Sequence, residues 1–149
     1  MKKLAPKSVR SNPLRLLLLF LIVPLIGCGL STGTPVHFVV PDGHQGMVYL
    51  ILDPTKGVVI PKKDGRFIVT FPVGGKLHVR DFRFINSWHQ ETAAFSKGTR
   101  IPTSTEPGRT AELAPGEVGF RGGGTSWDGN GREYIWYFIG TQSDLETAK

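Results

Sequence analysis

The chain has little cysteine: among its 149 residues there is one, Cys28. A single thiol cannot close an intrachain disulfide or build a cysteine-rich metal site, so both frameworks are excluded. Long helical periods are missing too, whereas nineteen glycines and eleven prolines are typical of short strands joined by turns. We therefore predict one all-β domain, an antiparallel β-sandwich of about seven strands, after an N-terminal signal helix.

Net positive charge is concentrated at the N-terminus. The chain carries +6, but five of its eighteen basic residues precede residue 16, which leaves thirteen against twelve acidic residues and a net charge of +1. The five are Lys2, Lys3, Lys7, Arg10 and Arg15. A nearly neutral domain lacks the basic surface that nucleic acid requires, so we expect no nucleic-acid partner.

The N-terminus has the anatomy of a signal peptide, with basic residues 1–15 followed by the apolar run Leu16–Ile26. The run is shorter than the about 20 apolar residues that cross a bilayer. It ends in Leu25-Ile26-Gly27-Cys28, which resembles the lipobox of bacterial lipoproteins. The resemblance implies cleavage between Gly27 and Cys28 and attachment of diacylglycerol and of acyl chains such as palmitate at Cys28. The alternative is an ordinary secretory signal or an uncleaved anchor.

The resulting organisation has four parts: a signal peptide at 1–27, a flexible tether at 28–35, the β-sandwich at 36–141 and a frayed tail at 142–149. The protein is then exported and anchored by lipid to the cell envelope. In lipoproteins of diderm bacteria, Asp after the cysteine retains the protein in the inner membrane. This chain has Gly29 there, so the resemblance favours the outer membrane.

Short apolar runs separated by Gly, Pro and Asp predict the strands. Residues 47–52 are apolar throughout, which predicts a central strand covered on both faces. Asp64-Gly65 predicts a tight hairpin between 58–60 and 66–71. In Lys76–Ile85 the apolar phase changes, which predicts a bulge near Arg80-Asp81. The other candidate strands are Val36–Val40, Trp88–Phe95, Val118–Phe120 and Tyr134–Ile139.

Three segments resemble an uncharacterised bacterial family of secreted or lipid-anchored domains. They are Val36–Gly46, Asp64-Gly65-Arg66-Phe67 and Phe71–Leu77, within residues 36–80. The shared motifs are turns, so the resemblance implies a sandwich fold of the immunoglobulin or prealbumin kind and no catalytic residues.

Catalytic and metal-binding motifs are also lacking. The four histidines show no ligand spacing, so we expect no metal and no cofactor. His89 and Glu91 have the spacing of strand neighbours on one face, and Asp81 is a third candidate for a hydrolase. The alternative for these residues is polar decoration of an exposed face.

The glycine-rich stretch at 119–131 lacks the Lys-Ser/Thr ending of a phosphate-binding loop. It contains a candidate site for a glycan or small molecule, because an indole can stack on a sugar ring while polar neighbours bind its hydroxyls. The candidate residues are Trp127, Asp128, Asn130 and Arg132. The alternative is a mobile strand connection whose Trp127 folds back on the sandwich.

Together these patterns predict a lipid-anchored envelope protein with a non-catalytic interaction or structural module. Its expected partners are the membrane and an envelope protein or glycan. The alternatives are glycan or small-molecule binding through the Trp127 loop and, third, a hydrolase around His89 and Glu91.

Overall fold

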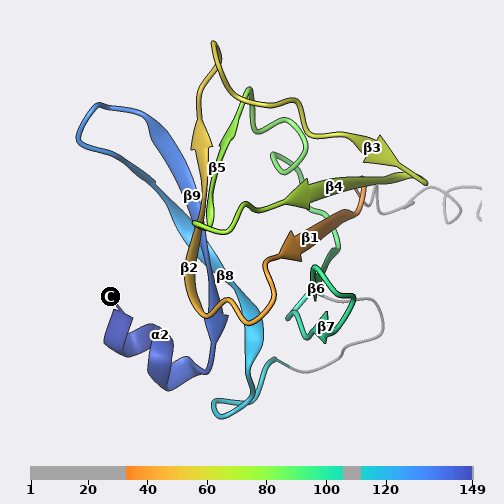
Figure 1. Ribbon diagram of the computed structural model, residues 1–149, viewed down its shortest axis with the longest axis vertical. Helices are drawn as coiled ribbons and strands as arrows, with labels where there is room; N and C mark the ends of the chain where they lie inside the picture. The colour runs from red at the N-terminus through yellow and green to blue at the C-terminus, as the bar shows by residue number, and fades with distance from the viewer. Residues whose placement is uncertain (1–32, 106–111, 149) are drawn as a thin grey trace, which may run out of the picture. The chain divides into compact units, whose positions relative to one another are not determined.

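The computed structural model describes residues 33–105 and 112–148, all of them in the compact unit Thr32–Lys149. These residues form two β-sheets and a short helix (Figure 1). The strands are β1 (Val36–Val40), β2 (Gly46–Leu52), β3 (Lys62–Lys63), β4 (Arg66–Thr70), β5 (Lys76–Val79), β6 (Glu91–Phe95), β7 (Arg100–Ile101), β8 (Gly119–Trp127) and β9 (Glu133–Gly140). Helix α2 (Gln142–Ala148) follows. Sheet A has the order β3-β4-β1-β6-β7 and sheet B the order β5-β2-β9-β8.

The fold is β-rich, as predicted, but its sheets are mixed rather than antiparallel. Strand β1 runs parallel to both β4 and β6, and β2 runs parallel to β5. The chain alternates between the sheets: it leaves sheet A after β1, passes through β2 in sheet B, and returns to β3 and β4. Parallel neighbours need such a crossover, which here is a strand of the opposite sheet. The antiparallel prediction is therefore wrong for these three pairs.

The two sheets share one hydrophobic core, and in Figure 1 the strands of sheet A run across those of sheet B. In β1, alternate residues Val36, Phe38 and Val40 are buried. The Phe38 ring centroid lies 4.7 Å from that of Phe120 and 4.9 Å from that of Tyr137. Aromatic rings at these distances pack favourably beyond their buried area, so Phe38 ties the sheets together.

The Asp64-Gly65 hairpin is confirmed, although its first strand differs from the prediction. Asp64 and Gly65 have φ values of 50° and 78°, in the left-handed region that this dipeptide favours. The turn joins β4 to Lys62-Lys63 instead of residues 58–60. Val58 forms an isolated bridge with Val79.

The bulge predicted near Arg80-Asp81 is wrong, because β5 ends at Val79. A turn follows, in which the Ile85 N–H bonds to the Phe82 carbonyl over 3.0 Å. The turn buries both Phe82 and Phe84. The turn, rather than a bulge, therefore accounts for the change in the alternation of apolar residues between Val79 and Phe82.

Two further segments differ from the sequence prediction. Strand β8 begins near the predicted strand 118–120 but continues through 121–127, which we expected to be a loop, and residues 142–148 form α2 rather than a frayed tail. Thr141 caps the helix, since its hydroxyl accepts the Asp144 N–H over 3.2 Å and the Asp144 carboxylate accepts the Thr141 N–H over 2.9 Å. No helix within 33–105 and 112–148 is long and apolar enough to cross a membrane.

The last residues of the predicted tether are bonded to the domain. The Gly33 N–H donates to the Trp88 carbonyl and the Phe67 N–H donates to the Pro35 carbonyl, each over 2.9 Å. The folded part thus includes residues 33–35. The lipobox and Cys28 lie outside the described residues.

Candidate ligand-binding face

The outer face of sheet B, which points away from sheet A, carries an ordered set of aromatic and charged side chains. Cross-strand partners share a face, so the strand register arranges these residues in two rows. The first row is Lys76, Tyr49 and Trp136, and the second is His78, Ile51 and Tyr134. Each row takes one residue from each of β5, β2 and β9.

A hollow of about 440 Å³ opens on this face. It is lined by Tyr49, Ile51, Lys76, His78, Asp128, Arg132 and Tyr134. Figure 1 shows the β8–β9 hairpin tip and α2 on this same side of sheet B, near opposite ends of it. A concave site of this size with aromatic walls and a few polar groups is the usual form of a small-ligand site.

The floor of the hollow is aromatic. The Tyr49 and Tyr134 rings meet edge to face, with centroids 5.8 Å apart, and both side chains are half-buried. The Lys76 ammonium lies 5.7 Å from the centre of the Tyr49 ring. This cation–π contact holds the ammonium over the face of the Tyr49 ring. The floor therefore offers ring surface for stacking beside a cationic donor.

The glycine run of β8 gives Trp136 its place on this face. A Cβ on Gly123 would collide with the Trp136 carbonyl oxygen and indole ring, and one on Gly124 would lie 3.4 Å from the Trp136 Nε1 atom. The β8–β9 register shifts between Gly122 and Thr125, at this contact. The glycines thus let the Trp136 indole lie against the β8 backbone. This close packing explains why a strand contains a run of glycines that is typical of a loop.

The hairpin tip forms the charged wall. The Asp128 Oδ1 atom accepts the N–H groups of Asn130 and Arg132, each over 2.9 Å, and its Oδ2 atom accepts the Arg132 Nε–H over 2.8 Å. The Arg132 backbone N–H, the Arg132 side chain and the Asn130 N–H hold the pKa of Asp128 below its usual range. The Asp128 carboxylate is thereby occupied, while the two terminal nitrogens of Arg132 remain donors for a ligand.

Two of the four predicted binding residues line the hollow, and two do not. Asp128 and Arg132 line the hollow, whereas Asn130 contributes its backbone N–H to the turn. Trp127 pairs with Glu133, one residue beyond the Ser126–Tyr134 pair, so it points to the opposite face from Tyr134. Its side chain is 66% exposed, so it has not folded back on the sandwich.

Another carboxylate stands behind the second row. The Asp53 Oδ2 atom lies 3.6 Å from His78 Nδ1. The Lys56 N–H, and after it the Thr55 N–H, keep the pKa of Asp53 low. Asp53 therefore stays ionised close to His78, which lines the hollow.

Sequence reasoning missed Tyr49 and Tyr134. Residues 47–52 predict a strand covered on both faces, yet only the inner face of β2 packs in the core, and Tyr49 is half-buried. The available signal was Tyr49, whose phenol is the one polar group in the run 47–52, because a phenol needs a polar partner or water. The pattern of residues 134–139 does not separate Tyr134 from the buried Tyr137.

A larger hollow, of about 610 Å³, lies beside α2 and is lined in part by Leu113, Arg121 and Leu145. The Arg121 guanidinium donates to the carbonyls of Ala114, Glu117 and Gly140 over 2.8–3.2 Å. Since these bonds occupy its cation, this hollow offers less to a ligand than the face of sheet B does.

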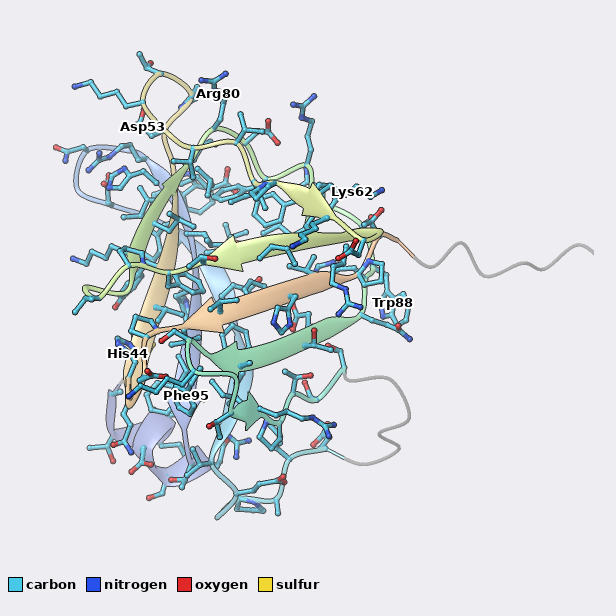
Figure 2. The ribbon with its side chains drawn as sticks, turned by 45° about the vertical axis from the view of Figure 1, so that its right-hand side comes forward. His44, Asp53, Lys62, Arg80, Trp88 and Phe95 are labelled. Carbon is cyan, nitrogen blue, oxygen red and sulfur yellow. The ribbon has the colours of Figure 1, made fainter. Side chains whose placement is uncertain are left out.

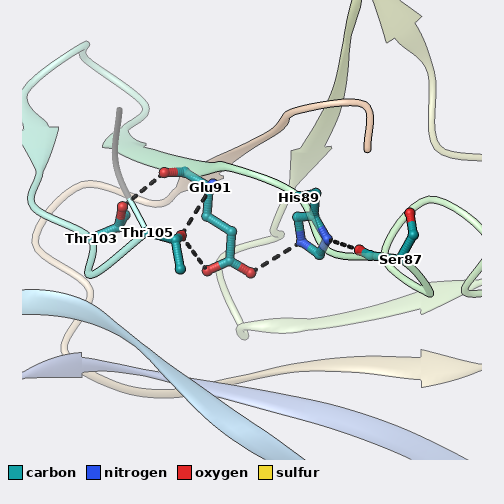
Figure 3. Close-up of polar contacts among 5 residues, drawn as sticks. All are labelled: Ser87, His89, Glu91, Thr103 and Thr105. Carbon is teal, nitrogen blue, oxygen red and sulfur yellow. Dashed lines mark hydrogen bonds and ion pairs between the residues drawn. The ribbon is translucent and has the colours of Figure 1, made fainter. Parts of the chain in front are cut away.

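The predicted His89–Glu91 pair is assembled at the start of β6 (Figure 3). The His89 Nε2 atom lies 3.2 Å from the Glu91 carboxylate, and the two side chains are 11% and 13% exposed. The Glu91 backbone carbonyl accepts the Thr103 hydroxyl over 2.8 Å, and the Glu91 N–H donates to Thr105 over 3.2 Å. These two bonds tie the segment after β7 to β6 through the Glu91 backbone.

The contacts of His89 favour its charged form. Its Nδ1 atom lies 2.6 Å from the Ser87 carbonyl oxygen, so both ring nitrogens face groups that only accept hydrogen bonds. The Glu91 hydrogen bond raises the pKa of His89 against the opposing effect of burial. A histidine held as imidazolium is a poor general base.

The third proposed catalytic residue is bound elsewhere. Asp81 accepts the Arg83 backbone N–H over 3.0 Å and its side chain over 2.8 Å. It lines a hollow with Val58 and Phe84. Among the residues that the structure describes, no group of three or more His, Cys, Asp or Glu is arranged to hold a metal ion.

Comparison with known proteins gives little similarity. No family model and no curated protein matches the chain. One similar crystal structure is of a protein described as "Putative Lipoprotein from Bacillus anthracis", with 12% identity and a TM-score of 0.47. The alignment covers 72% of this chain and 71% of that one. The family resemblance suggested by the turn motifs stays a prediction.

Proposed function

We propose that this protein is a lipid-anchored cell-envelope protein whose β domain binds carbohydrate on the outer face of sheet B and is not an enzyme. The observation that carries the proposal is the hollow with Tyr49 and Tyr134 in its floor and Lys76 and Arg132 at its rim. Pyranose rings present C–H faces that stack on aromatic rings, and hydroxyl groups that accept hydrogen bonds from cationic donors. This proposal moves the glycan site from the Trp127 loop to the sheet.

The anchor part of the proposal rests on the lipobox resemblance. Acyl chains on Cys28 would hold the protein firmly, since each buried methylene contributes about 0.8 kcal/mol and a lipoprotein anchor carries two or more chains. Gly29 after the cysteine favours the outer membrane in a diderm cell. An envelope location would place the domain among cell-surface glycans.

The non-catalytic part rests on the state of the candidate catalytic groups. His89 is held between two acceptors, and Asp81 is bound to Arg83. A hydrolase would need a free base or nucleophile beside a substrate cavity.

The test is binding of the full-length protein, in detergent, to an array of oligosaccharides. We expect at least one saccharide to bind, and Tyr49→Ala to weaken that binding about tenfold, the equivalent of about 1.4 kcal/mol of lost stacking. Trp127→Ala is the matched control, because that indole is exposed on the opposite face. Absence of binding, or a loss confined to Trp127→Ala, would contradict the proposal.

A further inference from the structure

The described chain begins at a surface that combines an exposed indole with several cations. The Gly33 N–H bonds to the Trp88 carbonyl over 2.9 Å, and the Trp88 side chain is 63% exposed. A Cβ on Gly33 would lie 2.8 Å from the Ser87 hydroxyl, so the backbone sits close against this segment. The first described residue is thus fixed beside Trp88.

The β3–β4 hairpin adds the cations to the same end. The Lys62 ammonium donates to the Thr34 hydroxyl over 3.4 Å, and Pro35 shares a small hollow with Arg66 and Gln90. Figure 2 shows Lys62 and Trp88 at one end of sheet A. The hairpin carries three exposed cations, Lys62, Lys63 and Arg66, and one carboxylate, Asp64. Its local charge is therefore positive.

Covalent geometry limits how far this end can lie from the lipid on Cys28. Four residues lie between Cys28 and Gly33, so their Cα atoms are five steps apart, and even a fully extended chain covers only about 17 Å over five steps of about 3.5 Å each. The headgroup layer adds several ångströms on each side of the hydrocarbon core. A domain tied at Gly33 consequently stays within reach of the headgroups.

We propose that Trp88 and the cations Lys62, Lys63 and Arg66 form a membrane-facing surface that rests on the headgroups of the bilayer holding the Cys28 lipid. Tryptophan prefers the interface between water and hydrocarbon, and Lys and Arg attract anionic headgroups. The surface rests on the anchor part of the proposed function and is independent of carbohydrate binding. In Figure 1 the start of β1 and the β8–β9 tip lie on opposite sides of the domain, so this orientation turns the hollow away from the lipid.

The test uses the protein purified from membranes and reconstituted in vesicles of phosphatidylethanolamine and phosphatidylglycerol that contain a headgroup-level nitroxide lipid as quencher. We expect the nitroxide to quench part of the tryptophan fluorescence, and Trp88→Phe to remove that quenched part. Trp127→Phe is the matched control, with a similar exposed fraction, 66% against 63%, and it should leave the quenched part in place.

A second variant tests the cations without touching the core. Changing Lys62, Lys63 and Arg66 together to Gln should at least halve the quenching on these vesicles, because the attraction to anionic headgroups is lost. The three side chains are exposed, so the change should leave the fold intact. Quenching that survives Trp88→Phe, quenching lost in Trp127→Phe, or no quenching at all would overturn the membrane-facing surface. The mass of the mature N-terminus is read separately: an unlipidated Cys28 overturns the anchor as well, whereas a lipidated Cys28 without quenching overturns only this surface.

Discussion

At the scale of a single residue, two hydrogen-bond acceptors favour the protonated form of His89. The Ser87 carbonyl and the Glu91 carboxylate both require an N–H, and the pKa of His89 is raised. Glu91 shares a face with Val36, at the margin of the core. The charged pair therefore lies within the fold at the start of β6, where the Glu91 backbone also bonds to Thr103 and Thr105.

The raised pKa of His89 predicts how stability depends on pH. The folded protein binds this proton more tightly than the unfolded chain, so the stabilisation is complete below about pH 6.5 and is lost as pH rises through the folded-state pKa. The expected loss is at most about 2 kcal/mol, the contribution of a charge-assisted hydrogen bond. Urea unfolding of wild type and His89→Gln measures it. The two curves should converge as pH rises, and a constant difference from about pH 6 to about pH 9 would contradict the account.

Gly123 gives a second residue-level prediction. Gly123→Ala places a methyl group against the Trp136 carbonyl and indole, so we expect a loss of about 1–3 kcal/mol in the free energy of unfolding. Gly122→Ala is the control, because its added Cβ meets nothing within 4 Å. Equal stability of the two variants would show that the indole does not lie on the β8 backbone.

At the scale of elements, the short helix α2 depends on its contact with the sheet. It has seven residues, too few to be stable alone, and its one buried side chain is Leu145. Phe138 is also buried, although it lies on the outer face of sheet B with Trp136 and Tyr134. The helix thus covers one end of that face and leaves the tyrosine end open.

Removing the Leu145 side chain should release the helix. In Leu145→Ala we expect hydrogen exchange at the amides of Glu146, Thr147 and Ala148 to rise about tenfold or more, since such a short helix keeps little stability without tertiary packing. Amides of β9 should stay protected, because β9 is paired on both sides. Exchange that is unchanged in α2, or that rises equally in β9, would contradict a local role.

Elements with their own local chemistry were predictable from the sequence, and those set by distant partners were not. Asp64-Gly65 needs only its left-handed φ values, so the hairpin could be found. The parallel neighbours of β1 depend on the chain alternating between sheets, which no local pattern records. The predicted strand at 118–120 was too short, because the glycines that continue β8 are explained by contact with Trp136 on the neighbouring strand β9 and by no pattern of their own.

In the candidate site, too, residues joined by local contacts were predictable and those joined by strand pairing were not. Asp128 and Arg132 could be found because they belong to one tight turn, while Tyr49 joins Tyr134 only through the β2–β9 pairing. The His89–Glu91 contact follows from two-residue spacing within one segment. Asp81 is not part of this contact, because its carboxylate is bonded to Arg83, two residues further on.

At the scale of the whole molecule, we propose a lipid anchor joined to a domain that presents a binding face. The cysteine provides the most direct variant. Wild-type protein should incorporate a palmitate analogue in a bacterial host, and Cys28→Ser should not, because serine cannot form the thioether. A wild-type N-terminus that retains residue 1 or carries a free thiol would contradict the anchor.

The central claim, that the outer face of sheet B binds carbohydrate, is tested most directly by the tyrosine ring signals in an NMR titration of ring-labelled protein. The chain has three tyrosines: Tyr49 and Tyr134 line the hollow, whereas Tyr137 is buried in the core and serves as the internal reference. With a saccharide selected on the array, the account predicts that the signals of Tyr49 and Tyr134 shift and that those of Tyr137 do not. Binding that leaves Tyr49 and Tyr134 unshifted would contradict it.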